Sequence, residues 1–245
     1  MLHPSLIGAR ACVFDAGGTL VHPDWARLAA LAEEVAGRSF GAGEMRRAFG
    51  EMLKRVGEEA RKSGGHTADE KSRHWTFRRM YGLLGLEEAA CECLVERIDA
   101  AHAERHIWCG VDPDAPRVID ELKRAGLRLA VISNTEDGRL RDSLEAAGLG
   151  GRFDLTVDSH LVGCRKPGAA IFRLALERLG VEAGEAVFVG DSYESDALAA
   201  RAAGLRAVLL DPLGLHTESV CPRIASLGEL IGDAGQRLRQ GGEEV

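Results

Sequence analysis

The sequence lacks long apolar runs, an excess of basic residues and any CxxC pair. No stretch of its 245 residues stays apolar for long enough to span a bilayer, so we expect no membrane partner. Lys and Arg number 31 against 38 Asp and Glu, and the resulting formal charge of −7 argues against a nucleic-acid partner. Residues 1–5 carry no basic region before an apolar run, so we expect no secretory signal and a cytoplasmic location.

The cysteines do not form an evident disulfide framework either. The six cysteines are scattered through the chain, which at 45% hydrophobic residues is long enough to bury a sizeable core. This scatter favours free thiols in a reducing compartment over a disulfide framework.

What the sequence does contain is an alternation of short apolar runs with amphipathic segments. The apolar runs show little alternation, as in strands that are buried on both faces, and cover residues 11–16, 127–133, 153–157, 186–189 and 205–210. The segments with helical spacing are residues 116–125, 138–147, 169–179 and 195–203. This order predicts an α/β fold with a parallel sheet and helices on both of its faces.

Residues 23–104 have a different pattern, because they contain no strand-like run. Apolar residues recur at helical spacing over residues 25–36, 43–62, 68–84 and 87–105. We therefore expect an all-helical cap of residues 23–104 inserted into a core of residues 1–22 and 105–245. Since it follows the first strand, the cap is expected to lie over the carboxyl end of the sheet, where ligands of such folds bind.

Polar and charged residues collect where the predicted strands end. Asp15 follows the first strand, Ser133 and Asn134 end the second, and Lys166 and Asp191 follow the third and fourth. The carboxyl ends of parallel strands meet at one edge of a sheet, so these side chains are expected to converge. Carboxylates beside glycine-rich turns suit Mg²⁺ and phosphate oxygens, which points to phosphoryl transfer.

These residues, in this order, resemble the motifs of the haloacid dehalogenase superfamily, a large group composed mostly of phosphatases. The four motifs read Asp15-Ala16-Gly17-Gly18-Thr19, Ser133-Asn134, Lys166-Pro167 and Gly190-Asp191 with Asp196. The helical insertion resembles the family's C1-type cap of subgroup I-A, and the resemblance covers nearly the whole chain. It implies a Rossmann-like core whose site is closed by the cap.

The resemblance also implies a role for each matching residue. Asp15 is similar to the nucleophile that forms an aspartyl-phosphate, and Ser133 and Lys166 match the other catalytic positions. The positions that match phosphate-binding residues are Gly18, Thr19, Ser133, Asn134 and Lys166.

A Mg²⁺ site is implied in the same way. Asp15, Asp191 and a backbone carbonyl near Gly17 match the family's metal ligands. Asp196 matches the residue that holds the water shell of the metal.

One position departs from the family pattern. Gly17 stands where the phosphatases carry a second Asp, which protonates the leaving oxygen and then activates water. General acid–base catalysis accelerates a reaction by about 10²–10⁴-fold, so we expect a slow phosphatase that acts on small phosphorylated molecules. A subgroup of dehalogenase-like domain proteins of unassigned activity also lacks this Asp. We expect a monomer or a homodimer.

Three alternatives remain open. The 2-haloacid dehalogenases carry an aromatic residue at this position and cleave a carbon–halogen bond without a metal. The phosphonoacetaldehyde hydrolases carry Ala there and use a cap lysine, for which Lys54 is the candidate. The alternative of another class is a catalytically silent protein that keeps the fold for binding or regulation.

Three histidines also bear on function. His22 follows motif one, where it is a candidate substitute for the missing acid, although an ordinary hinge or surface histidine is commoner. His102 and His106 have the i, i+4 spacing of some zinc ligands. Without an evident third ligand, we expect these two on a solvated helix face.

Overall fold

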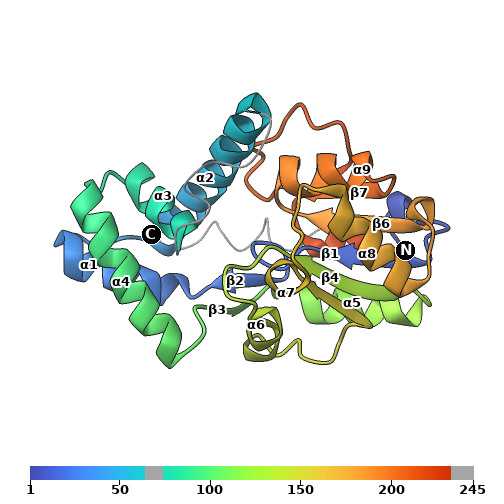
Figure 1. The fold of residues 1–245 in the computed structure, drawn as a ribbon, viewed down its shortest axis with the longest axis horizontal. Coiled ribbons are helices and arrows are strands. Elements are labelled where there is room, and N and C mark those ends of the chain that lie inside the picture. The colour runs from blue at the N-terminus through green and yellow to red at the C-terminus, as the bar shows by residue number, and fades with distance from the viewer. Residues whose placement is uncertain (64–73, 233–245) are drawn as a thin grey trace.

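The computed structural model describes residues 1–63 and 74–232, and a six-stranded parallel sheet forms its centre (Figure 1). The strand order is β5-β4-β1-β6-β7-β8. The strands are β1 (Ala11–Phe14), β4 (Arg128–Ser133), β5 (Leu155–Asp158), β6 (Ala186–Gly190), β7 (Arg206–Leu210) and β8 (Arg223–Ile224). The α/β class predicted from the sequence is confirmed, with the five expected apolar runs forming five of the six strands.

Both faces of the sheet are buried, which explains why the strands show no polar alternation. Cys12 and Phe14 of β1 belong to the apolar cluster that contains α5 (Ala115–Arg124) and α6 (Leu140–Ala146). Their neighbours Ala11 and Val13 belong to the cluster on the other face, with α8 (Ala169–Leu179) and α9 (Ala199–Ala202). Successive residues of a strand point to opposite faces, so a strand between two helical layers must be apolar throughout.

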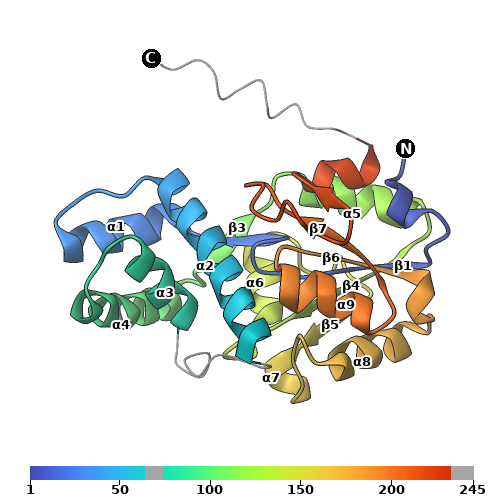
Figure 2. The same ribbon diagram turned by 90° about the horizontal axis from the view of Figure 1, so that it is seen from above.

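Four of the helices in the described part of the chain form a separate unit beside the sheet, called the helical unit below (Figures 1 and 2). They are α1 (Trp25–Ala36), α2 (Ala42–Ser63), α3 (Trp75–Leu83) and α4 (Glu88–Glu104). The unit has its own apolar core, in which Leu28, Phe77 and Tyr81 are fully buried. Figure 2 shows α2 between the rest of the unit and the sheet, and α2 contacts the turn of residues 193–198.

A two-stranded antiparallel sheet joins the helical unit to the sheet. β2 (Val21–Pro23) precedes the unit, β3 (Trp108–Val111) follows it, and the two strands pair with each other. The sequence did not predict these strands, because they are three and four residues long and contain Pro23 and Gly110. Both connections therefore leave the helical unit at one place.

The remaining elements are short. They are the 3-10 turns Pro4–Leu6, Ala183–Glu185 and Leu227–Ile231, helix α7 (Ser159–Val162) and the π-helical turn Tyr193–Leu198. The helix expected over residues 195–203 is this π-turn followed by α9. Residues 68–73, the first part of the helix expected over 68–84, lie outside the described residues. All six cysteines are free, and no described helix has the length and apolar character needed to cross a bilayer.

Truncating Phe172 tests the packing between α8 and the sheet. Phe172 is fully buried, and its ring meets the edge of the Phe188 ring at a centroid distance of 5.3 Å. Because Phe172→Ala leaves a cavity there, we expect it to lower the free energy of unfolding by about 3–5 kcal/mol, as measured by denaturant titration. The control is Leu161→Ala, whose side chain is exposed and whose effect should stay within about 0.5 kcal/mol. Equal losses of unfolding free energy in the two variants would contradict a close packing of α8 against the sheet.

Candidate active site

The carboxyl ends of the parallel strands bring the predicted site residues together. Phe14 pairs with Val131 of β4 and Val189 of β6, so Asp15 follows between two strands that end in Ser133 and Gly190. A cavity of about 550 Å³ lies at this edge. The predicted site residues that line it are Asp15, Gly17, Ser133, Asn134, Lys166, Asp191 and Asp196.

A buried lysine joins two carboxylates at the floor of the cavity. Lys166 Nζ donates to Asp15 Oδ1 at 2.5 Å and to Asp196 Oδ1 at 2.6 Å. The hydroxyl of Thr19 donates to the other oxygen of Asp15, at 3.3 Å. All four side chains are buried, so these contacts fix the orientation of the Asp15 carboxylate.

Asn134 positions this lysine through two backbone hydrogen bonds. Its Nδ2 donates to the Lys166 carbonyl at 2.9 Å, and its Oδ1 accepts from the Lys166 N–H at 2.9 Å. The side-chain amide thereby joins the loop after β4 to the loop that carries Lys166. Asn134 therefore holds the backbone of Lys166 in place, which makes it a positioning residue for the lysine.

Two glycines make room for the acidic groups. Gly18 has a φ of +91°, and a Cβ there would lie 1.9 Å from Oδ2 of Asp191. A Cβ on Gly190 would lie 2.4 Å from Oδ2 of Asp196. Gly18 and Thr19, which matched phosphate-binding positions, do not line the cavity; Thr19 contacts Asp15, and Gly18 leaves space for Asp191.

Burial and like charge raise the pKa values of the carboxyl groups. Burial raises the pKa of Asp15 to about 6, with Lys166 opposing the shift and Asp196 adding to it. Burial, followed by the charges of Asp15 and Asp196, raises the pKa of Asp191 well above its usual value. Burial disfavours the charged form of Lys166, but Asp15 and Asp196 outweigh it and raise the pKa of this ammonium group.

The donor set of this site fits a divalent cation. Carboxylate oxygens of Asp15, Asp191 and Asp196 lie within 4.8 Å of one another. With all three ionised, the charge is −3, and the ammonium of Lys166 reduces it to −2. An oxygen-rich site of this charge suits Mg²⁺, which carries two positive charges and prefers oxygen ligands.

The indole ring of Trp108 lies against Gly17, where the family's second Asp is absent. A Cβ on Gly17 would lie 3.1 Å from Cζ3 of Trp108, which is tighter than an ordinary van der Waals contact. Phe49 of α2 and Phe77 of α3 pack against this indole at ring-centroid distances of 5.8 and 5.7 Å. An aromatic cluster therefore borders the side of the cavity next to motif one.

The helical unit supplies an apolar wall of the cavity. Glu194 of the core lines the same cavity. Leu53 and Val56 of α2 line the cavity together with Phe49. Glu194 lines it from the π-turn, and its buried Oε2 has no hydrogen-bond partner among the described residues. Burial is also the main reason why the pKa of Glu194 is raised.

Two residues considered from the sequence lie elsewhere. His22 does not line the cavity, and its Nε2 lies 3.6 Å from Asp112 Oδ2. Lys54 does not line it either, because its ammonium group donates to the Leu215 carbonyl at 2.9 Å. This geometry argues against His22 as the missing acid and against Lys54 as a Schiff-base lysine.

The expectation that His102 and His106 lie on a solvated helix face is wrong. α4 ends at Glu104, and both histidines are buried, with 8% and 9% of their surfaces exposed. Asp137, in the loop after β4, lies next to them. Nothing in the linear spacing revealed this third group, because it is about 30 residues away in the chain.

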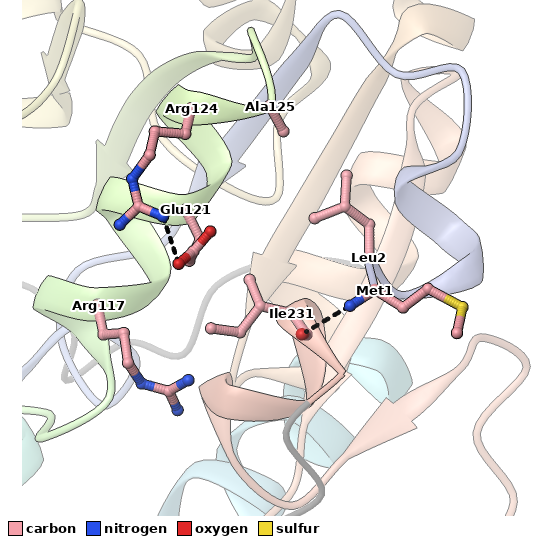
Figure 3. A pocket seen from close by; sticks show the side chains of 7 residues that line it. All are labelled: Met1, Leu2, Arg117, Glu121, Arg124, Ala125 and Ile231. Atoms are coloured by element: carbon pink, nitrogen blue, oxygen red, sulfur yellow. Dashed lines mark hydrogen bonds and ion pairs between the residues drawn. The ribbon is translucent and has the colours of Figure 1, made fainter.

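A second hollow, of about 520 Å³, carries no comparable chemistry (Figure 3). It lies between α5 and the chain ends that the structure describes. In it, the amino group of Met1 contacts the Ile231 carbonyl, and Arg124 pairs with Glu121. The catalytic side chains predicted from the sequence therefore all belong to the first cavity or to the groups that support it.

Comparisons with known proteins agree with this geometry. Residues 9–204 match a family model described as haloacid dehalogenase-like hydrolase. A ribulose-1,5-bisphosphate 5-phosphatase of Halopiger xanaduensis is 29% identical over 83% of this chain and 85% of its own length. A phosphoserine phosphatase of Thermus thermophilus is 39% identical over 58% of this chain, and the match spans only 57% of that relative.

The fold also matches solved structures. The magnesium-bound HAD-hydrolase YfnB of Bacillus subtilis superposes with a TM-score of 0.65 at 22% identity, over 92% of this chain and 98% of that one. This similarity concerns the fold alone, whereas the family model covers most of the sequence. The chain therefore belongs to the haloacid dehalogenase-like hydrolase family and is a hydrolase.

Proposed function

We propose that this hydrolase is a Mg²⁺-dependent phosphatase that acts on small phosphorylated molecules through an aspartyl-phosphate on Asp15. The observation that carries the proposal is the Asp15 carboxylate, which Lys166 and Thr19 orient at the floor of a 550 Å³ cavity. The names of the two phosphatase relatives support the same reaction class.

In this mechanism, a carboxylate oxygen of Asp15 attacks phosphorus, and the bond from phosphorus to the leaving oxygen breaks. The electron pair of that bond leaves with the oxygen. Water then attacks the phosphorus of the aspartyl-phosphate and gives up a proton to solvent. The bond from phosphorus to Asp15 breaks, and its electron pair returns to the carboxylate as phosphate is released. Lys166 and Ser133 hold phosphoryl oxygens during both steps. Asp15, Asp191 and a backbone carbonyl near Gly17 would hold Mg²⁺, which would neutralise charge on the phosphoryl group.

We further propose that residues 23–104 act as a cap and choose the substrate. Phe49, Leu53 and Val56 come from this segment and form the apolar wall opposite the acidic floor. The contact of Lys54 with the Leu215 carbonyl holds α2 against the core when the cap is closed. Closure excludes water from the phosphoryl group and leaves the apolar wall to select the leaving group.

The absence of an acid at position 17 limits which leaving groups depart quickly. The leaving oxygen receives no proton from motif one, and the Trp108 indole occupies the neighbouring space. Groups that are stable as anions need little protonation, so aryl phosphates should react faster than alkyl phosphates.

Substituting the nucleophile tests the covalent step. Because Asp15→Asn removes the attacking oxygen's charge, we expect phosphate release from an aryl phosphate to fall by about 10³-fold or more. The control is Asp120→Asn, which removes a half-exposed carboxylate that pairs with Arg152. Release that persists in Asp15→Asn would exclude the covalent route, and no release from the unmodified protein would exclude the phosphatase.

The leaving-group preference tests the missing acid. We expect release from an aryl phosphate to exceed that from an alkyl phosphate by about 10²-fold or more, since a positioned acid contributes this much. Gly17→Asp alone should leave this ratio of aryl to alkyl release unchanged, because Trp108 crowds the new side chain. The double variant Gly17→Asp with Trp108→Ala should lower the ratio by about 10-fold, since the new carboxyl group then has space to protonate the alkyl leaving group. Similar rates on both esters in the unmodified protein would indicate another acid, for which Glu194 is the candidate in the cavity.

Mg²⁺ binding separates an enzyme from a silent relative of the family. At 100 times its dissociation constant, Mg²⁺ should raise the melting temperature by about 5–10 °C. Asp191→Asn should abolish this rise, because it removes a metal ligand, while Asp120→Asn should keep it. If Mg²⁺ leaves the melting temperature unchanged in the unmodified chain and in both variants, the silent binding role is favoured.

A further inference from the structure

The cavity contains a second group of metal-binding side chains, away from the motifs of the family. His102, His106 and Asp137 offer ligand atoms that lie within 4.8 Å of one another. The two histidines are buried, and the carboxylate is exposed at the edge of the cavity. Two imidazoles with one carboxylate form a ligand set that is common for zinc.

The ring of His106 is oriented as in metal-binding histidines. Its Nδ1 lies 3.2 Å from the Trp108 carbonyl, which accepts a hydrogen bond from that nitrogen. The proton on Nδ1 leaves Nε2 with a free lone pair. A backbone carbonyl that fixes the outer nitrogen in this way is the usual support of a histidine ligand.

The spacing between His102 and Asp137 also fits a shared cation. His102 Nε2 lies 3.3 Å from Asp137 Oδ2. Neighbouring ligands of a tetrahedral zinc ion are about 3.4 Å apart, given metal–ligand distances of about 2.0–2.1 Å. A ligand atom of His106 lies within 4.8 Å of those of His102 and Asp137, so a shared cation requires only a small movement of this side chain.

Binding of a cation requires the ring proton of His102 to move from Nε2 to Nδ1. Without the cation, Nε2 carries the proton that it donates to Asp137, and Nδ1 accepts from the Ile107 N–H at 3.3 Å. Coordination through Nε2 moves the proton to Nδ1 and gives up this long hydrogen bond. The exchange opposes binding, so the expected affinity is micromolar, weaker than that of a structural zinc site.

We propose that His102, His106 and Asp137 form a second cation site that binds Zn²⁺ or Co²⁺ in preference to Mg²⁺. Imidazole ligands suit these transition metals, whereas Mg²⁺ prefers oxygen ligands alone. Three protein ligands leave one position of a tetrahedral ion open to water or to a ligand in the cavity.

The site joins two parts of the fold. His102 lies on α4 of the helical unit, and Asp137 lies in the loop directly after β4. A cation shared by them ties the end of α4 to the core and adds a link beside the paired strands β2 and β3. The proposal does not depend on the phosphatase reaction, since its test measures the bound metal.

Cobalt absorption tests the site on the full chain after chelator treatment. In the presence of excess Mg²⁺, we expect one equivalent of Co²⁺ to bind and to give the visible absorption of tetrahedral coordination, without the charge-transfer band of thiolate ligands. Zn²⁺ should displace it. His106→Ala and Asp137→Asn should each weaken Co²⁺ binding by about 10-fold or more, since each removes a ligand.

One control variant and one conservative test variant make the result decisive. His160→Ala removes an exposed histidine that lines the same cavity, and it should bind Co²⁺ as the unmodified chain does. Asp137→Asn keeps an oxygen that can accept from the Arg139 N–H, so it tests the site even where His106→Ala destabilises the fold. Absence of Co²⁺ binding, displacement by Mg²⁺, or unchanged binding in Asp137→Asn would overturn the proposal.

Discussion

The arrangement of the active site depends on one buried ammonium group shared by two carboxylates. Asp15 and Asp196 both lie inside the protein, where an unpaired negative charge is strongly disfavoured. Lys166 lies between them and makes the two short contacts that compensate their charges. The backbone of Lys166 is fixed in turn by Asn134, so the second motif acts on the Asp15 carboxylate through the third.

The groups that the sequence predicted correctly are those whose position follows from the strands. The carboxyl ends of parallel strands all lie at the same edge of the sheet. Asp15, Ser133 and Asp191 follow or end such strands, and they line one cavity as expected. The expected Mg²⁺ chemistry is compatible with their spacing, but the roles assigned to them stay predictions until the substitutions are made.

The groups that the sequence did not predict come from tertiary packing. Trp108 reaches Gly17 although 90 residues of chain separate them, because β2 and β3 pair and bring the chain back beside motif one. Asp137 reaches His102 for a similar reason, as the end of α4 lies beside the loop after β4. No periodicity or local spacing encodes such contacts, and a lone tryptophan or aspartate carries no signal for them.

The contact between Gly17 and Trp108 constrains how the site can evolve. A carboxylate gained at position 17 meets the indole, and an indole lost at position 108 leaves the aromatic cluster of Phe49 and Phe77 without its centre. A side chain at position 17 requires the indole to shift by a few tenths of an ångström, so the effect of a substitution at either position depends on the residue at the other. An acid introduced at position 17 therefore requires the indole of Trp108 to shift or to be replaced, and packing as well as chemistry restricts which residues this position accepts.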